Sequence, residues 1–349
     1  MKNARRPDWK IGPEYALLVC IGLTLSLFGA RPLRAQAPET DLILHVQTTL
    51  ALVDGVAEQQ NPITHNPMIL TTIEKNDFRL FDNGREVAVQ TFDVGVEHTT
   101  RPIALWLIVQ CNMGFPPDWG STFMRGQTQN LKPALQHLDK ADLIGVAHWC
   151  DDGQAKADVT PGTDVNAALK GVDAALGAEA SFGSNRAGEL AMQRMIHLIV
   201  EKTQELTPAR LPVLLFLYGD HGATDPGEAA SIVVDLLQTS GVVFGLNNGT
   251  FYQDPLESIR GGKTWGLVHY YSQRTGGQCY STWRPELFAQ ALDYIVTQLH
   301  LRYTLSFQPS KLDGRTHELR VELTRDAQKR FPKTTLRFRR EYIPMKPAQ

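Results

Sequence analysis

Long apolar runs alternate with helix-like segments through the middle of the chain. Two runs are apolar at nearly every position, I-A-L-W-L-I-V at 103–109 and P-V-L-L-F-L-Y at 212–218, which is typical of strands buried on both faces of a sheet. Shorter strand patterns occupy 143–149, 242–246 and 277–282. Apolar residues at helical spacing predict helices over 131–137, 164–175, 187–205, 228–239 and 285–300. This alternation predicts an α/β fold with a doubly wound, mostly parallel sheet and helices on both faces.

Both flanks of this region have the apolar–polar alternation of β-strands. On the N-terminal side, 42–53 and 77–92 alternate, the latter around the hairpin dipeptide Asn83-Gly84. On the C-terminal side, the alternating segments are 303–307, 317–323 and 335–343. We therefore expect an α/β domain over 99–300, inserted between β segments at 38–98 and 301–349 that pair in one β-sandwich.

The first residues have the pattern of an export signal. Lys2, Arg5, Arg6 and Lys10 precede an apolar stretch at 16–30, the order found in signal peptides. The small residues around Ala30, Ala35 and Ala37 offer cleavage sites, and the alternative is an uncleaved N-terminal membrane anchor. Residues 1–37 thus predict a periplasmic or secreted protein, in contact with a membrane only if this segment stays attached.

Composition narrows the choice of function. The chain has 349 residues and a formal net charge of −2 at pH 7, so charge gives no reason to expect nucleic acid as a partner. The sequence contains no G-x-S-x-G, H-E-x-x-H or P-loop motif, so we expect no catalytic residues and no enzyme. Outside the signal, Cys111, Cys150 and Cys279 lack the paired spacing of zinc ligands.

Several motifs occur in an order that resembles the acidobacterial-type VWFA-related family, whose secreted members contain a von Willebrand factor A-like domain. They are D-F-R-L-F-D-N-G-R-E-V at 77–87, the apolar run at 103–109, D-L-I-G-V-A-H-W at 142–149, V-L-L-F-L-Y-G-D-H at 213–221, T-G-G-Q-C-Y at 275–280 and L-R-Y-T-L-S-F-Q-P at 301–309. The resemblance implies an A-type domain. Such domains usually carry a metal-ion-dependent adhesion site, built from D-x-S-x-S after the first strand together with a Thr and an Asp.

In this sequence the motif of that site is degenerate. The resemblance places Gln110, Asn112 and Gly114 where the family has Asp, Ser and Ser. The Thr position falls on Ser184 or on the cationic Arg186, and Asp220 alone keeps its carboxylate. Because Mg²⁺ prefers charged oxygen ligands, we expect no bound metal and no other cofactor. The alternative is weak Mg²⁺ binding through Asp220, Asn112 and Ser184.

The same resemblance makes Cys111 and Cys150 neighbours, because each follows one of two adjacent parallel strands. They form either a disulfide across the strand ends or two reduced thiols. The aromatic loop at 115–124 either forms a recognition patch or seals the sheet end. The resulting hypothesis is an exported, non-enzymatic protein that binds an unidentified protein partner without a divalent metal. A secreted hydrolase acting through His221 and Asp225 is the alternative from another class.

Overall fold

A computed structural model describes residues 50–60, 67–95, 101–111, 128–178, 183–219, 226–247, 266–281 and 285–344. The chain divides into two compact units, 1–47 and 48–349, and all described residues belong to the second. The predicted export signal at 1–37 lies outside the described residues. Within them, no helix has both the length and the apolar character needed to cross a membrane.

The two apolar runs lie side by side in a six-stranded sheet with the order β11-β10-β9-β6-β7-β8. Its strands are β6 (Ile103–Gln110), β7 (Leu143–Trp149), β8 (Ala155–Gly162), β9 (Leu211–Tyr218), β10 (Val242–Asn247) and β11 (Cys279–Ser281). Neighbouring strands from β11 to β7 pair in parallel, whereas β8 runs antiparallel to β7. The sheet is therefore a mixed one, parallel except at the β8 edge.

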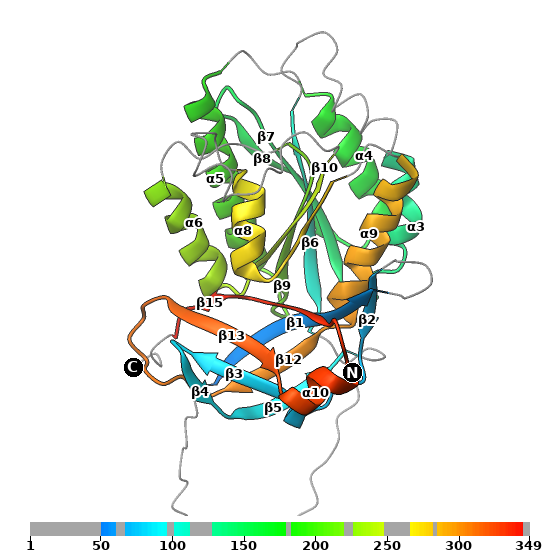
Figure 1. The fold of residues 1–349 in the computed structure, drawn as a ribbon. Helices are drawn as coiled ribbons and strands as arrows, with labels where there is room; N and C mark the ends of the chain where they lie inside the picture. Colours follow the sequence, from blue (N-terminus) through cyan, green and yellow to red (C-terminus); the bar gives the residue numbers. More distant parts are fainter. Residues whose placement is uncertain are drawn as a thin grey trace, which may run out of the picture. The chain divides into compact units, whose positions relative to one another are not determined.

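Helices cover both faces of this sheet (Figure 1). On one side lie α3 (Lys132–Leu135), α4 (Val165–Leu176) and α9 (Pro285–His300), and on the other lie α5 (Asn185–Gln204), α6 (Pro226–Gln238) and α8 (Leu267–Thr275). Alternate residues of β6 enter two separate apolar clusters: Leu105 and Leu107 pack towards α4 and α9, Trp106 and Ile108 towards α5 and α6. Both faces of β6 are buried for this reason, and the helices on both faces agree with the sequence pattern.

The two β flanks pair with each other, forming two further sheets. One has the order β14-β1-β12-β5, with β2 also paired to β1, and the other has the order β15-β13-β3-β4. Their strands are β1 (Ala51–Gln60), β2 (Pro67–Leu70), β3 (Phe78–Asp82), β4 (Arg85–Val87), β5 (Val89–Val94), β12 (Tyr303–Phe307), β13 (His317–Leu323), β14 (Thr335–Phe338) and β15 (Glu341–Tyr342). Short helical segments are η1 (Lys75–Asp77), η2 (Thr128–Leu131) and α10 (Arg325–Arg330).

Strands from distant parts of the sequence are neighbours in these sheets. β1 pairs antiparallel with β12 and β14, and β3 pairs antiparallel with β13. The β3–β4 hairpin turns at Asn83 and Gly84, which have φ angles of 49° and 78°, as the Asn-Gly dipeptide predicts. Leu80 of β3 and Leu305 of β12 belong to one buried apolar cluster. That the two sheets form a sandwich stays a prediction.

A buried carboxylate connects the flanking strands to α9. Glu58 in β1 is 6% exposed. Its Oε1 accepts a hydrogen bond from the Tyr294 hydroxyl at 3.0 Å, and its Oε2 accepts one from Arg337 Nε at 2.6 Å. Because a buried carboxylate is stable only when its oxygens are paired, this contact fixes β1 and β14 against the helix that leads into β12.

Candidate functional site

The carboxyl ends of β6, β7 and β9 meet at one edge of the six-stranded sheet, the edge to which Gln110 belongs. Gln110 ends β6 and is followed by Cys111, Trp149 ends β7 and is followed by Cys150, and Gly219 follows β9. The backbone N–H of Cys111 donates to the carbonyl of Trp149 at 2.9 Å. The hydrogen bonding between β6 and β7 thus continues as far as Cys111.

Cys111 and Cys150 are joined by a disulfide in the structure, with their Cα atoms 5.2 Å apart. Both cysteines are almost completely buried. The bond connects the ends of two adjacent parallel strands and so limits how far these ends can separate. Cys279 in β11 is half-buried, and its Sγ lies 3.4 Å from the Ser272 hydroxyl.

The Gln110 amide packs between two other chain segments at this edge. Its Nε2 donates to Asp151 Oδ1 at 2.9 Å. On the side of Gly219, a Cβ atom would lie 2.5 Å from Gln110 Cβ and 2.8 Å from Oε1. Position 219 also has a φ of +90°, so glycine is required there both for space and for backbone conformation. Gln110 is consequently fixed by neighbours on two sides.

Asp151 is a residue of this site that the sequence patterns did not predict. It follows Cys150 directly in the segment C-D-D-G at 150–153, and its partner Gln110 lies 41 positions away. Its position, an acidic residue just after a buried strand, is the sequence feature that could have indicated a site residue. The carboxylate of Asp151 accepts from a neutral NH₂ group, whereas an Asp or Glu at position 110 would place a second negative charge against it.

The two candidates for the family's Thr position have other roles in the structure. The Ser184 hydroxyl accepts a hydrogen bond from the backbone N–H of Ala187 at 3.1 Å, which caps the N-terminus of α5. Arg186 forms ion pairs with Glu189, at 3.3 Å, and with Glu228. The hydrogen bond that Arg186 donates to Glu228, followed by the charges of both carboxylates, raises the pKa of Arg186 despite the opposing effect of desolvation. A guanidinium is therefore held close to the start of α5.

The segment before α5 lies directly against Asp151. A Cβ atom on Gly183 would lie 1.5 Å from the carbonyl oxygen of Asp151, so only glycine permits this approach. Through Asp151 the structure brings Gln110 and the Ser184 segment to one place. The remaining predicted positions, Asn112, Gly114 and Asp220, lie outside the described residues, as do His221, Asp225 and the aromatic loop at 115–124.

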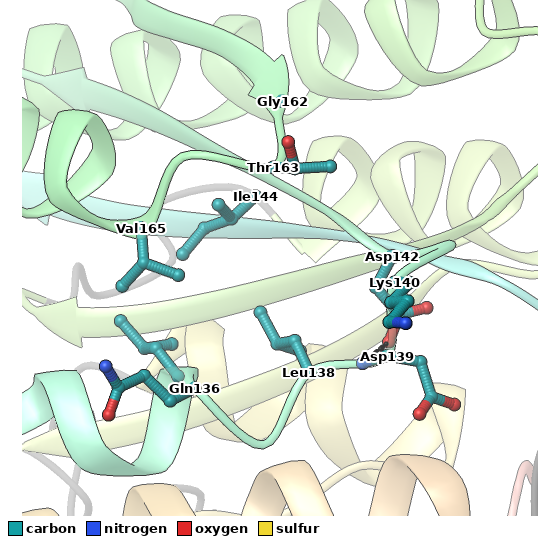
Figure 2. Close-up of a pocket in the computed structure, with 10 residues that line it drawn as sticks. Gln136, Leu138, Asp139, Lys140, Asp142, Ile144, Gly162, Thr163 and Val165 are labelled. Carbon is teal, nitrogen blue, oxygen red and sulfur yellow. Dashed lines mark hydrogen bonds between the residues drawn. The ribbon is translucent and has the colours of Figure 1, made fainter.

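A second cluster with metal-binding residue types lies at the opposite edge of the sheet, where β6 begins. Asp139, Asp142 and His300 bring their ligand atoms within 4.8 Å of one another. Asp139 and Asp142 also line a pocket of about 450 Å³. Figure 2 shows both of them with Lys140 at one end of this pocket, and Leu138, Ile144 and Val165 are among the residues that line the rest of it.

The hydrogen bonds of Asp142 indicate a structural role for this cluster. Its Oδ1 accepts from the N–H of Ile103 at 2.9 Å, and its Oδ2 accepts from the N–H of Asp139 and pairs with His300 Nε2 at 2.8 Å. Burial alone would raise the pKa of Asp142, but these hydrogen bonds outweigh burial and lower the pKa below its ordinary value. The carboxylate joins the start of β6, the turn before β7 and the end of α9.

No protein-family model matches the sequence, and no curated protein sequence matches it either. Among solved structures, the chain is similar to an aerotolerance-related membrane protein from Bacteroides fragilis (TM-score 0.38) and to BatB from Bacteroides thetaiotaomicron (TM-score 0.40). Each is 10% identical and covers 56% of this chain and 98% of its own. A von Willebrand factor type A protein from Catenulispora acidiphila is also 10% identical, has a TM-score of 0.39, and covers 80% of this chain and 76% of its own. Scores of this size do not establish the family of the chain.

Proposed function

We propose that this chain is an exported, non-enzymatic protein of the VWFA-related kind, which binds a protein partner without a divalent metal. The binding edge would be the carboxyl edge of the six-stranded sheet, where loops of parallel sheets usually present their functional residues. The observation that supports the metal-free version most is the hydrogen bond from Gln110 Nε2 to Asp151.

This hydrogen bond bears on metal binding because it shows how the side chain at position 110 is used. A hard cation needs negatively charged oxygen ligands in order to displace its bound water. Gln110 carries no charge, and its NH₂ group occupies the neighbouring Asp151 oxygen. At the start of α5, Arg186 is paired with Glu189 and Glu228, so this position provides a guanidinium where the family motif has the neutral hydroxyl of a Thr ligand.

The disulfide supports the export part of the proposal, because such bonds persist in oxidising compartments. It also favours a rigid binding edge, since Cys111 and Cys150 connect two of the strand ends that would carry the contacts. In the complete arrangement that we propose, the flanking sheets pack as a β-sandwich and the A-type α/β domain is inserted between their halves. The absence of known catalytic motifs in the sequence favours a binding role over catalysis.

Calorimetric titration of the purified protein with Mg²⁺ and Mn²⁺ tests the proposal. We expect no saturable heat for either ion, in the wild type or in Asp220→Ala, the variant that removes the one carboxylate retained from the family motif. Micromolar binding that is lost in Asp220→Ala would instead favour the weakened site of Asp220, Asn112 and Ser184. Asp326→Ala, in the exposed first turn of α10, is the matched control for loss of a carboxylate elsewhere.

A further inference from the structure

A cavity of about 270 Å³ lies at the amino edge of the six-stranded sheet, opposite to the edge with Gln110. Its walls include Arg101 before β6, Arg210 before β9 and Ser240 before β10. Of the described residues that line it, only Arg101 and Arg210 carry a charge, and both are cations. The lining is thus positively charged.

Two further arginines, both buried, lie directly behind this lining. Arg302 is 4% exposed, and its Nη2 donates to the backbone carbonyl of Arg101 at 3.2 Å. Arg339 is 2% exposed, and its Nη2 donates to the backbone carbonyl of Ser240 at 2.8 Å. Each guanidinium is therefore bonded to a residue that lines the cavity, one on the side of β6 and the other on the side of β10.

Strand register explains why these two arginines come together, although they are 37 positions apart (339 − 302). Tyr303 in β12 and Phe338 in β14 both pair with Gly55, one on each side of β1. Arg302 and Arg339 lie one residue along from these partners. The register therefore places one cation on each side of β1, Arg302 just before β12 and Arg339 just after β14.

No direct ion pair neutralises these arginines within the described part of the chain. Arg302 and Arg339 donate instead to backbone carbonyls, and the Nε of Arg339 meets no hydrogen-bond acceptor in the described structure. The charge of Asp54 raises the pKa of both buried arginines. Its Oδ1 accepts a hydrogen bond from the Thr304 hydroxyl at 2.6 Å.

Burial is the main influence on the pKa of the two buried arginines. Burial lowers the pKa of Arg302 and of Arg339; the charge of Asp54 opposes this lowering and outranks that of Arg101, which lowers both. For Arg302 the Asp142 carboxylate also opposes it, and for Arg339 the charge of Arg302 adds to it. Buried cations are strongly destabilising unless a counter-charge compensates them, so an anion in the cavity would gain from all of these charges.

We propose that this cavity binds a small oxyanion of the phosphate or sulfate type. Arg101 and Arg210 would contact the anion, and Arg302 and Arg339 would supply positive potential from behind the lining. Guanidinium groups match the geometry of such oxyanions through paired N–H donors. The volume lies below the roughly 300–1,000 Å³ of pockets that hold drug-sized ligands, which limits the occupant to a free ion or one anionic group. The site shares no residue with the proposed metal-free binding edge.

Calorimetry and thermal unfolding with inorganic phosphate and sulfate test this proposal, with chloride and acetate at equal ionic strength as comparison anions. We expect Tm of the full chain to rise with phosphate or sulfate concentration, because a ligand that binds only the folded state stabilises it. Arg101→Gln removes one charged contact and should weaken binding by about tenfold or more. Arg101 is exposed, so this variant should fold normally.

Arg325→Gln is the matched control, because Arg325 is also exposed but lies in α10, away from the cavity. It should bind phosphate as the wild type does. Equal Tm shifts with all four anions, or equal shifts in Arg101→Gln and Arg325→Gln, would show a general salt effect and overturn the proposal. Acetate binding as tight as phosphate binding would overturn the assignment to a phosphate or sulfate group.

Discussion

Replacing Gln110 by glutamate tests the geometry of the carboxyl edge, because the side chain keeps its length and exchanges its NH₂ donor for a charged oxygen. In the wild type, Gln110 Nε2 lies 2.9 Å from Asp151 Oδ1. In Gln110→Glu two carboxylates face each other, and Gly219 on the other side restricts how far the new side chain can turn away. We therefore expect a loss of stability that depends on charge.

The expected loss has two parts. A hydrogen bond to a charged group contributes roughly 1.5–3 kcal/mol to stability. Two unit charges that relax to about 6 Å repel by about 3 kcal/mol at an effective dielectric constant of about 20, and the partial exposure of Asp151 reduces this to roughly 1 kcal/mol. The free energy of unfolding should consequently fall by about 2–4 kcal/mol near neutral pH.

Urea unfolding of the wild type, Gln110→Glu and the uncharged control Gln110→Met measures this loss. The control loses only the hydrogen bond and should be the more stable variant near neutral pH. The repulsion raises the folded-state pKa of the introduced Glu above its ordinary value of about 4.3, so the penalty is present above that raised pKa. It disappears as pH falls through it. Equal stability of the two variants near neutral pH would refute the close contact with Asp151.

Three further perturbations have outcomes that the structure predicts. Asp142→Asn removes a carboxyl whose pKa is lowered in the folded state. The carboxylate stabilises the folded protein above its unfolded pKa of about 3.9, and this stabilisation is lost as pH falls through the folded pKa. Acid unfolding followed by circular dichroism should therefore be less steep in the variant than in the wild type. Glu58→Gln weakens a buried contact and should reduce the free energy of unfolding by about 1–3 kcal/mol, whereas Glu86→Gln, which removes an exposed pair, should change it by less than about 0.5 kcal/mol. Substituting Cys111 and Cys150 by Ser removes a disulfide that closes a loop with a sequence separation of 39, and the free energy of unfolding should fall by about 4 kcal/mol on the chain-entropy relation. A reducing agent should lower the Tm of the wild type and leave the Tm of the double variant unchanged.

The sequence predicted those elements whose pattern is set by burial. β6 and β9 are apolar at nearly every position because helices cover both of their faces. β8 was missed, since A-K-A-D-V-T-P-G at 155–162 lies at the half-buried sheet edge and contains Pro161, where neither an apolar run nor strict alternation is required. α8 was also missed, because L-V-H-Y-Y-S-Q-R-T at 267–275 mixes polar and aromatic residues.

Prediction of the candidate site stopped at contacts between distant segments. Strand ends identify Gln110 and Cys111, since parallel strands present their carboxyl ends at one edge. The hydrogen bond to Asp151 and the close approach of Gly219 depend on how three loops meet, which a single sequence does not encode as a local pattern. The four arginines around the cavity were missed for the same reason, because β-strand register brings Arg302 and Arg339 together.

Electron paramagnetic resonance of Mn²⁺ mixed with the full chain tests the proposal of a metal-free carboxyl edge most directly, because protein-bound Mn²⁺ loses the sharp signal of the hydrated ion. We predict that the wild type leaves the hydrated signal unchanged at equimolar concentrations. A loss of this signal in the wild type, restored in Asp220→Ala and not in Asp326→Ala, would contradict it.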